Sequence, residues 1–154
     1  MLAKHPVYED YGQEWRLGDV LGCYLDLDSG MLQWSVNGQE LGAAFHVPKP
    51  ELGEIFYPAA SLHDGAQLDF NFGDESSRPL QYAPHPSEWT PVGLAAPHNH
   101  CIANPLDWRL NPHDASDAID TSPDGHSAQA RNGQGWQGQR ANKGVKDTCV
   151  CCCG

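Results

Sequence analysis

Two short groups of side chains in this 154-residue chain carry atoms that could bind a metal ion. Asp26, Asp28 and Gly30 have the spacing that opens a calcium loop, and His98 to Cys101 (HNHC) offers imidazole and thiolate ligands. An EF-hand loop needs glycine at its sixth position and glutamate at its twelfth, where this chain has methionine and asparagine. Structural zinc needs a fourth ligand at standard spacing, which the HNHC group lacks. We therefore expect a hairpin turn at 26–30 and predict no metal site and no cofactor.

Two further groups, His63-Asp64 and the terminal run Cys149 to Gly154 (CVCCCG), could support catalysis or modification. An imidazole beside a carboxylate can move protons, but no nucleophile or oxyanion donor can be placed beside this pair. The last four residues could be a prenylation signal on Cys151, although a final glycine is not a usual choice. Palmitoylation and metal capture stay open, and an unselected tail is the preferred interpretation. We predict no catalytic residue.

Charge and composition exclude several function classes. The net charge is −11, and residues 1–92 carry four Lys and Arg against fourteen Asp and Glu. An acidic surface repels phosphate, so we expect no direct nucleic-acid binding. The sequence has no run of eighteen apolar residues and no apolar core in its first residues, which argues against a membrane span and a signal peptide. Its cysteines form no disulfide framework, so we expect an intracellular protein of the nucleus or cytoplasm.

Residues 18–45 have the pattern of three antiparallel strands joined by two tight turns. Apolar residues alternate with small or polar ones from Leu21 to Leu27 and from Leu32 to Val36, as in strands with one buried face. Asn37-Gly38 favours a type I′ hairpin, because both central residues of that turn need positive φ. The residues expected to face the core are Leu21, Cys23, Leu25, Leu27, Leu32, Trp34 and Val36. One apolar face needs a second sheet to cover it, so the predicted fold is an all-β antiparallel β-sandwich.

The rest of the chain divides into a second strand region and a polar region. We predict a short buried strand at 57–62 and another at 66–72, with Leu68, Phe70 and Phe72 facing inward. Residues 111–147 are rich in Asn, Asp, Gly, Gln and Ser and poor in aliphatic side chains. Such a segment cannot bury enough apolar surface to offset its ordering entropy, so we expect it to be disordered.

Five motifs in this order resemble the SPRY domain, a β-sandwich interaction module, over residues 11–92. They are WRLGDVLG (15–22), LDLDSG (25–30), VNGQELGAAF (36–45), YPAASL (57–62) and LDFNFG (68–73). Three shorter pieces, YGQE (11–14), GCYLD (22–26) and FGDE (72–75), are similar to the SPRY domain inserted in a DEAD-box RNA helicase. SPRY domains normally begin several strands earlier, so the resemblance implies an N-terminally incomplete SPRY domain at 1–92. Residues 93–154 are then a low-complexity tail.

The resemblance implies that the chain recognises another protein or peptide through the loops of the sandwich. These loops are Glu14–Gly18, Val47–Glu54 and Leu62–Gly65, and the third corresponds to a peptide-binding loop in some SPRY proteins. The candidate partner-binding residues are Trp15, Arg16, His63, Asp64 and Gly65. Two alternatives stay open. The chain could be a fragment of an ATP-dependent RNA helicase, although it has no Gly-Lys-Ser/Thr loop to hold ATP, or a non-functional gene-model product.

Overall fold

A computed structural model describes residues 10–47, 55–75, 77–82, 89–95, 107–133, 135–145 and 150–153. Over these residues the regular secondary structure is almost entirely β, which confirms the predicted all-β class. The strands are β1 (Leu21–Asp26), β2 (Met31–Val36), β3 (Gln39–His46), β4 (Ala59–Leu62), β5 (Gln67–Asp69), β6 (Thr90–Pro91), β7 (Leu110–Ala115), β8 (Ile119–Thr121), β9 (Ser127–Ala130), β10 (Gln137–Ala141) and β11 (Val150–Cys153). A 3₁₀ turn, η2 (Val92–Leu94), follows β6. No described helix is long and apolar enough to cross a membrane.

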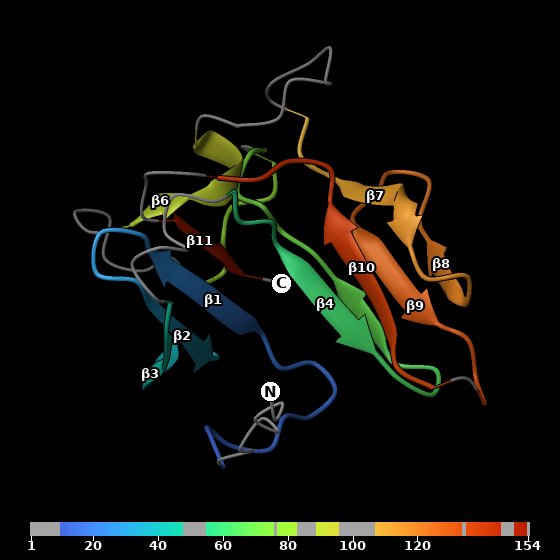
Figure 1. Cartoon of the computed structure of the whole chain (residues 1–154), viewed down its shortest axis with the longest axis horizontal. Helices are drawn as coiled ribbons and strands as arrows, with labels where there is room; N and C mark the ends of the chain where they lie inside the picture. The colour runs from blue at the N-terminus through green and yellow to red at the C-terminus, as the bar shows by residue number, and fades with distance from the viewer. Residues whose placement is uncertain are drawn as a thin grey trace, which may run out of the picture.

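The strands form three sheets. A five-stranded sheet has the order β3-β2-β1-β11-β6, and two three-stranded sheets have the orders β4-β10-β7 and β5-β9-β8. Every described pairing of named strands is antiparallel except that of β11 with β6. Figure 1 shows the five-stranded sheet on the left and the other two sheets on the right. Strands that are far apart in the sequence pair with each other, as β1 does with β11 and β4 with β10.

The predicted hairpins of the meander are confirmed. Asn37 and Gly38 have φ of 50° and 80°, as a type I′ turn requires, and Val36 pairs with Gln39 across it. In the turn after β1, a carboxylate oxygen of Asp26 accepts hydrogen bonds from the backbone N–H groups of Asp28 and Ser29. This Asx turn gives the aspartate spacing a backbone role.

The edge strand β3 is bulged rather than regular. Its register with β2 shifts on both sides of Gln33. The hydroxyl of Tyr11 accepts a hydrogen bond from the N–H of Trp34 (3.2 Å) and donates one to the carbonyl of Gly42 (2.7 Å). Tyr11 thus bridges backbone groups of β2 and β3 at the bulge, and it fixes the segment before β1 against this sheet. Bulges twist an edge strand and make pairing with another chain less favourable.

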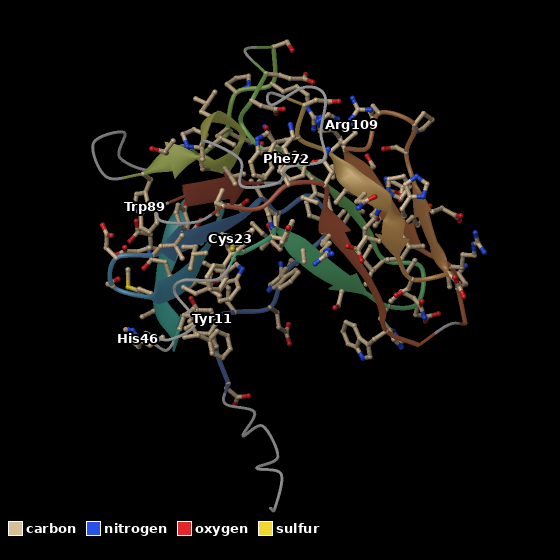
Figure 2. All side chains as sticks on the ribbon, turned by 45° about the horizontal axis from the view of Figure 1, so that its top comes forward. Tyr11, Cys23, His46, Phe72, Trp89 and Arg109 are labelled. Atoms are coloured by element: carbon tan, nitrogen blue, oxygen red, sulfur yellow. The ribbon has the colours of Figure 1, made fainter. Side chains whose placement is uncertain are left out.

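The core lies mainly among side chains from the second half of the chain. Its largest buried side chains are Trp108 and Phe72, whose ring centroids are 6.0 Å apart. Figure 2 shows Phe72 near the middle of the molecule. The full buried cluster is Leu25, Leu27, Leu62, Phe72, Val92, Ala95, Trp108, Leu110, Ile119, Ala128, Ala130, Ala141 and Val145. Of the three residues predicted to face inward at 66–72, only Phe72 is fully buried, while Leu68 and Phe70 pack against the cluster half-buried.

The predicted face of the first sheet is partly wrong. Leu25, Leu27 and Val36 are buried as expected, but four of the predicted core residues are only half-buried, namely Leu21, Cys23, Leu32 and Trp34. Residues from the opposite face are buried instead, namely Tyr24, Gln33 and Ser35. The physical reason is that both faces of the sheet are covered in part. The ring of Trp89 lies 5.3 Å from that of Tyr24, and the Tyr24 hydroxyl has a hydrogen-bond partner in Ser35 (3.0 Å).

Two other expectations need correction. Residues 107–133 and 135–145 contain the strands β7 to β10, so the predicted disorder of 111–147 is wrong for the described part of that segment. Its small side chains pack in the core, and its polar ones form turns. The strand at 57–62 begins only at Ala59 and is mostly exposed, with Leu62 alone buried, because β4 packs through its last residue. The boundary at residue 92 and the incompleteness at the N-terminus stay predictions.

Candidate interaction surface

The turn between β4 and β5 contains three of the predicted site residues. The N–H of Ala66 donates to the carbonyl of His63 (3.0 Å), and the two residues between them, Asp64 and Gly65, have φ of 46° and 81°. Positive φ at both central positions defines a type I′ turn, which glycine and aspartate adopt at low cost. The local sequence His-Asp-Gly thus folds into a tight turn with the imidazole at its start.

A second turn, after β9, holds the first one in place. A carboxylate oxygen of Asp64 accepts a hydrogen bond from the N–H of Gly133 (3.0 Å). The ring of Trp136 lies 5.2 Å from that of His63 at a tilt of 45°. Trp136 is nevertheless 74% exposed. The result is an imidazole and an indole in contact, on backbone that hydrogen bonds restrain, with most of the indole facing solvent.

The loop before β1 carries the other two predicted residues. Trp15 is 61% exposed. The N–H of Arg16 donates to a carboxylate oxygen of Asp19 (2.7 Å), whose own N–H donates back to the carbonyl of Arg16 (3.0 Å). The side-chain amide of Asn37 donates to the other oxygen of Asp19 (2.8 Å). The hydrogen bonds that the Asp19 carboxylate accepts, first from Asn37 and then from the Arg16 N–H, lower its pKa below its usual value. They also hold the loop against the hairpin turn.

The structure places the two groups along one edge of the molecule. In Figure 1 the loop at 14–18 and the turn at 62–66 both lie along the lower edge. The contacts described for Arg16 go to Asp19, and the ring contact of His63 goes to Trp136. The third predicted loop, at 47–54, lies outside the described residues after Val47.

Trp136 is the residue that sequence reasoning missed. Its segment, GQGWQGQR (133–140), is polar and was assigned to a disordered region. The available signal was the indole itself, because a large aromatic residue in a polar segment needs either a core or a partner. Its position beside His63 could not be predicted, since the two residues are far apart in sequence.

Other surfaces of the described residues are weaker candidates for a binding site. Two open depressions of about 320 Å³ each lie on the described surface. The first lies over β4 and β10, where Arg140 is already committed to an ion pair with Asp114 and to the ring of Tyr57 (4.6 Å). Among the residues that the structure describes, no three His, Cys, Asp or Glu side chains gather as metal ligands would. The HNHC group at 98–101 lies outside those residues.

Comparison with known proteins supports the resemblance. The family model of the SPRY domain matches residues 2–75. The chain is 29% identical over 125 residues to the ATP-dependent RNA helicase DDX1 of Xenopus laevis, and 38% identical over 99 residues to the ATP-dependent RNA helicase Ddx1 of Drosophila melanogaster. These matches cover 81% and 64% of this chain, but the chain spans only 13% of the length of either relative. No solved structure matches significantly.

The longer match also reaches the second half of the chain. It covers 125 residues, which exceeds the length of 1–92, so the similarity to the Xenopus relative continues beyond residue 92. The structured segment at 107–145 is consistent with that continuation. Both relatives are helicases, as the motifs at 11–14, 22–26 and 72–75 indicated, and the SPRY domain is a non-catalytic protein-interaction module. Residues 2–75 of this chain are therefore similar to the SPRY domain.

Proposed function

We propose that this chain binds a protein partner through one edge of its sheets, the interaction edge. The interaction edge is defined as Trp15, Arg16, His63, Asp64, Gly65 and Trp136. The observation that carries the proposal is the pair of exposed indoles, 61% exposed at Trp15 and 74% at Trp136, set on turns that hydrogen bonds restrain. Tryptophan is enriched among the residues that dominate binding energy, and a restrained loop loses less entropy on binding.

The chemistry of the edge favours a polypeptide over a small molecule or a nucleic acid. The hollows are open rather than enclosed, whereas small-molecule sites bury most of their ligand. The net charge of −11 disfavours a phosphate backbone and favours a partner with basic residues. In this proposal the chain has no catalytic residue and acts inside the cell, in the nucleus or the cytoplasm.

A displayed library of peptides with random sequence tests the interaction edge without knowledge of the partner. Peptides are selected on the wild-type chain, and the affinity of the selected peptides is then measured for Trp15→Ala, Trp136→Ala and Leu94→Ala. Leu94 is the control, because it is 60% exposed on η2, outside the interaction edge. We expect at least one indole variant to weaken binding by tenfold or more, about 1.4 kcal/mol, and Leu94→Ala to have no effect. Selected peptides that bind all three variants equally would exclude the interaction edge.

A second candidate function rests on the relatives. We propose that the full-length protein that contains this sequence is an ATP-dependent RNA helicase, in which this segment recruits a partner. Sequencing of the full-length transcript decides between this and the alternative of a non-functional gene-model product. A continuous reading frame with a Gly-Lys-Ser/Thr loop supports the helicase, and stop codons close to both ends of the frame exclude it. The purified 154-residue chain is expected to show no RNA-stimulated ATP hydrolysis.

A further inference from the structure

Strand β11 gives the cysteine cluster near the C-terminus a defined position in the fold. It lies between β1 and β6 in the five-stranded sheet, as Figure 1 shows. Its antiparallel register with β1 sets Cys152 directly opposite Cys23, while Cys151 is opposite Tyr24 and Cys153 is opposite Gly22. Two cysteines that are far apart in the sequence, Cys23 and Cys152, are therefore register partners in the sheet.

The register selects one cysteine of the cluster. Residues directly opposite each other in an antiparallel pair lie on the same face of the sheet, and neighbours along a strand alternate between faces. Cys152 thus shares a face with Cys23, which is half-buried on β1 and labelled in Figure 2. Cys151 and Cys153 belong to the other face.

The spacing suits a covalent bond. Opposed Cα atoms of an antiparallel pair are about 4.5 or 5.5 Å apart, depending on whether the pair is hydrogen-bonded. Both values fall within the range of about 4.4–6.8 Å that disulfides span. The backbone spacing of the opposed pair Cys23 and Cys152 is therefore compatible with a disulfide.

We propose that Cys23 and Cys152 form a reversible disulfide, which fastens β11 to β1 when the protein meets a disulfide oxidant such as glutathione disulfide. One cysteine thiolate attacks the oxidant and displaces one glutathione thiolate, which leaves a mixed disulfide on the protein. The second cysteine thiolate attacks the protein sulfur of that mixed disulfide and displaces the other glutathione. Two cysteine thiols are oxidised to one disulfide, and one glutathione disulfide is reduced to two glutathione thiols.

The bond would act on the sheet as a whole. Among the described residues, β6 joins the sheet through the pairing of Val150 with Thr90 and of Cys151 with Pro91. A bond between β1 and β11 therefore also retains β6, and with it the contact of Trp89 with Tyr24. It closes a loop that contains most of the chain, and long closed loops restrict the unfolded state most strongly.

Variants that retain one cysteine of the cluster test the register. The full chain is prepared with Cys152 alone (Cys149→Ser, Cys151→Ser, Cys153→Ser), and in matched forms that keep only Cys151 or only Cys153. Each protein is equilibrated with mixtures of reduced and oxidised glutathione, remaining thiols are alkylated, and cross-linked peptides are identified by mass spectrometry without reduction. We expect the Cys23 cross-link in the form with Cys152 alone, and its loss in that form after Cys23→Ser.

Thermal melting provides the second measurement. Oxidation of the form with Cys152 alone should raise Tm by about 5–15 °C, and dithiothreitol should reverse the rise. The proposal is overturned if the forms with Cys151 or Cys153 cross-link to Cys23 as readily as the form with Cys152. It is equally overturned by oxidation that yields only links between chains or links to Cys101, or by no disulfide at any glutathione ratio.

Discussion

The meander at 20–47 and the segment at 107–145 reach similar antiparallel structures from very different sequences. The meander alternates aliphatic and polar residues around Asn37-Gly38, and its strands were predicted correctly from that pattern. The later segment has few aliphatic residues, and its predicted disorder is wrong where the structure describes it. The comparison shows that a count of large apolar side chains underestimates which segments can fold.

The later segment compensates with small buried residues and with turns. Ala128, Ala130 and Ala141 are each 1% exposed and belong to the same buried cluster as Trp108. The turn between β8 and β9 is closed by the carboxylate of Asp124, which accepts hydrogen bonds from the Ser122 hydroxyl and the His126 N–H. Alanine loses no side-chain entropy on burial, so it stabilises a close-packed core at little cost.

The largest expected effect is that of Trp108→Ala, which compares the two segments directly. Trp108 is 0% exposed and packs against Phe72, so its removal leaves a large cavity and should lower the free energy of unfolding by about 3–5 kcal/mol. Trp34→Ala is the matched substitution in the meander. Its indole is half-buried between Tyr11 and Phe45, so we expect a loss of only about 1–2 kcal/mol.

Urea unfolding followed by far-UV circular dichroism measures both losses. If residues 107–145 were disordered, Trp108→Ala would change stability by no more than a surface substitution, within about 0.5 kcal/mol. A larger loss for Trp34 than for Trp108 would reverse the comparison and place the main core in the meander.

A smaller effect is expected from alanine at the glycines of the two turns. Gly38 in the meander and Gly125 after β8 have φ of 80° and 74°, and a Cβ at either would lie under 3 Å from a side-chain carbon, of Tyr82 or of Arg109. We expect Gly38→Ala and Gly125→Ala to cost about 1–3 kcal/mol each. Gly133→Ala is the control, since its φ of 71° is similar but no atom lies within 4 Å of its added Cβ. If the free energy of unfolding fell equally at all three positions, positive φ alone would explain the losses, and contacts of the added Cβ would contribute nothing.

The turns of the later segment could have been predicted from the sequence. Pro123-Asp124-Gly125 has the form of a turn between two short strands, and Asn132-Gly133 marks another. Recognition of both would have predicted the β8–β9 hairpin and the turn that leads to Trp136. The pairings of β4 with β10 and of β1 with β11 were not predictable, because the partners are far apart in sequence and no local pattern specifies them.

Because long-range pairings cannot be predicted from local patterns, the binding surface and the buried sheet faces were also predicted only in part. The resemblance to SPRY domains supplied the binding role expected for the loop Leu62–Gly65, and the local sequence is enough to form its turn. Its contact with Trp136 depends on the fold of a segment that was expected to be disordered. The wrong faces in β1 and β2 have a related origin, since alternation shows that a strand has two faces but not how much of each the distant strands cover.

Lys143 gives a pH-dependent test of burial in the later segment. Burial lowers its pKa below 10.5, because it penalises the charged ammonium, although the carboxylates of Asp107 and Asp74 oppose this in part. Between the lowered pKa and the usual one, the unfolded state binds more protons than the folded state. The free energy of unfolding should therefore rise with pH through that window, and the penalty should be fully present below it.

Lys143→Met removes the group that titrates and keeps an apolar side chain of similar length. At neutral pH we expect this variant to be as stable as the wild type or more stable. Urea unfolding of both proteins between about pH 8 and pH 11 isolates the effect as a difference, since the other titrating groups are shared. A difference in stability that does not vary with pH would show that the Lys143 ammonium is well solvated.

The smallest predicted effect is a lowered carboxyl pKa at one aspartate in each segment. Hydrogen bonds from Arg131 lower the pKa of Asp120 in β8, and hydrogen bonds from Asn37 and the Arg16 backbone lower that of Asp19 before β1. An NMR titration of the side-chain carboxyl carbons should place both midpoints below 3.8. Groups of this kind stabilise the fold above their usual pKa, and the contribution is lost as the pH falls through the lowered one. Arg131→Gln should return only Asp120 to its usual value, because Asp19 is held by different donors. Since a disordered segment would leave Asp120 titrating normally in the wild type as well, this midpoint reports on the order of residues 107–145 independently of any unfolding measurement.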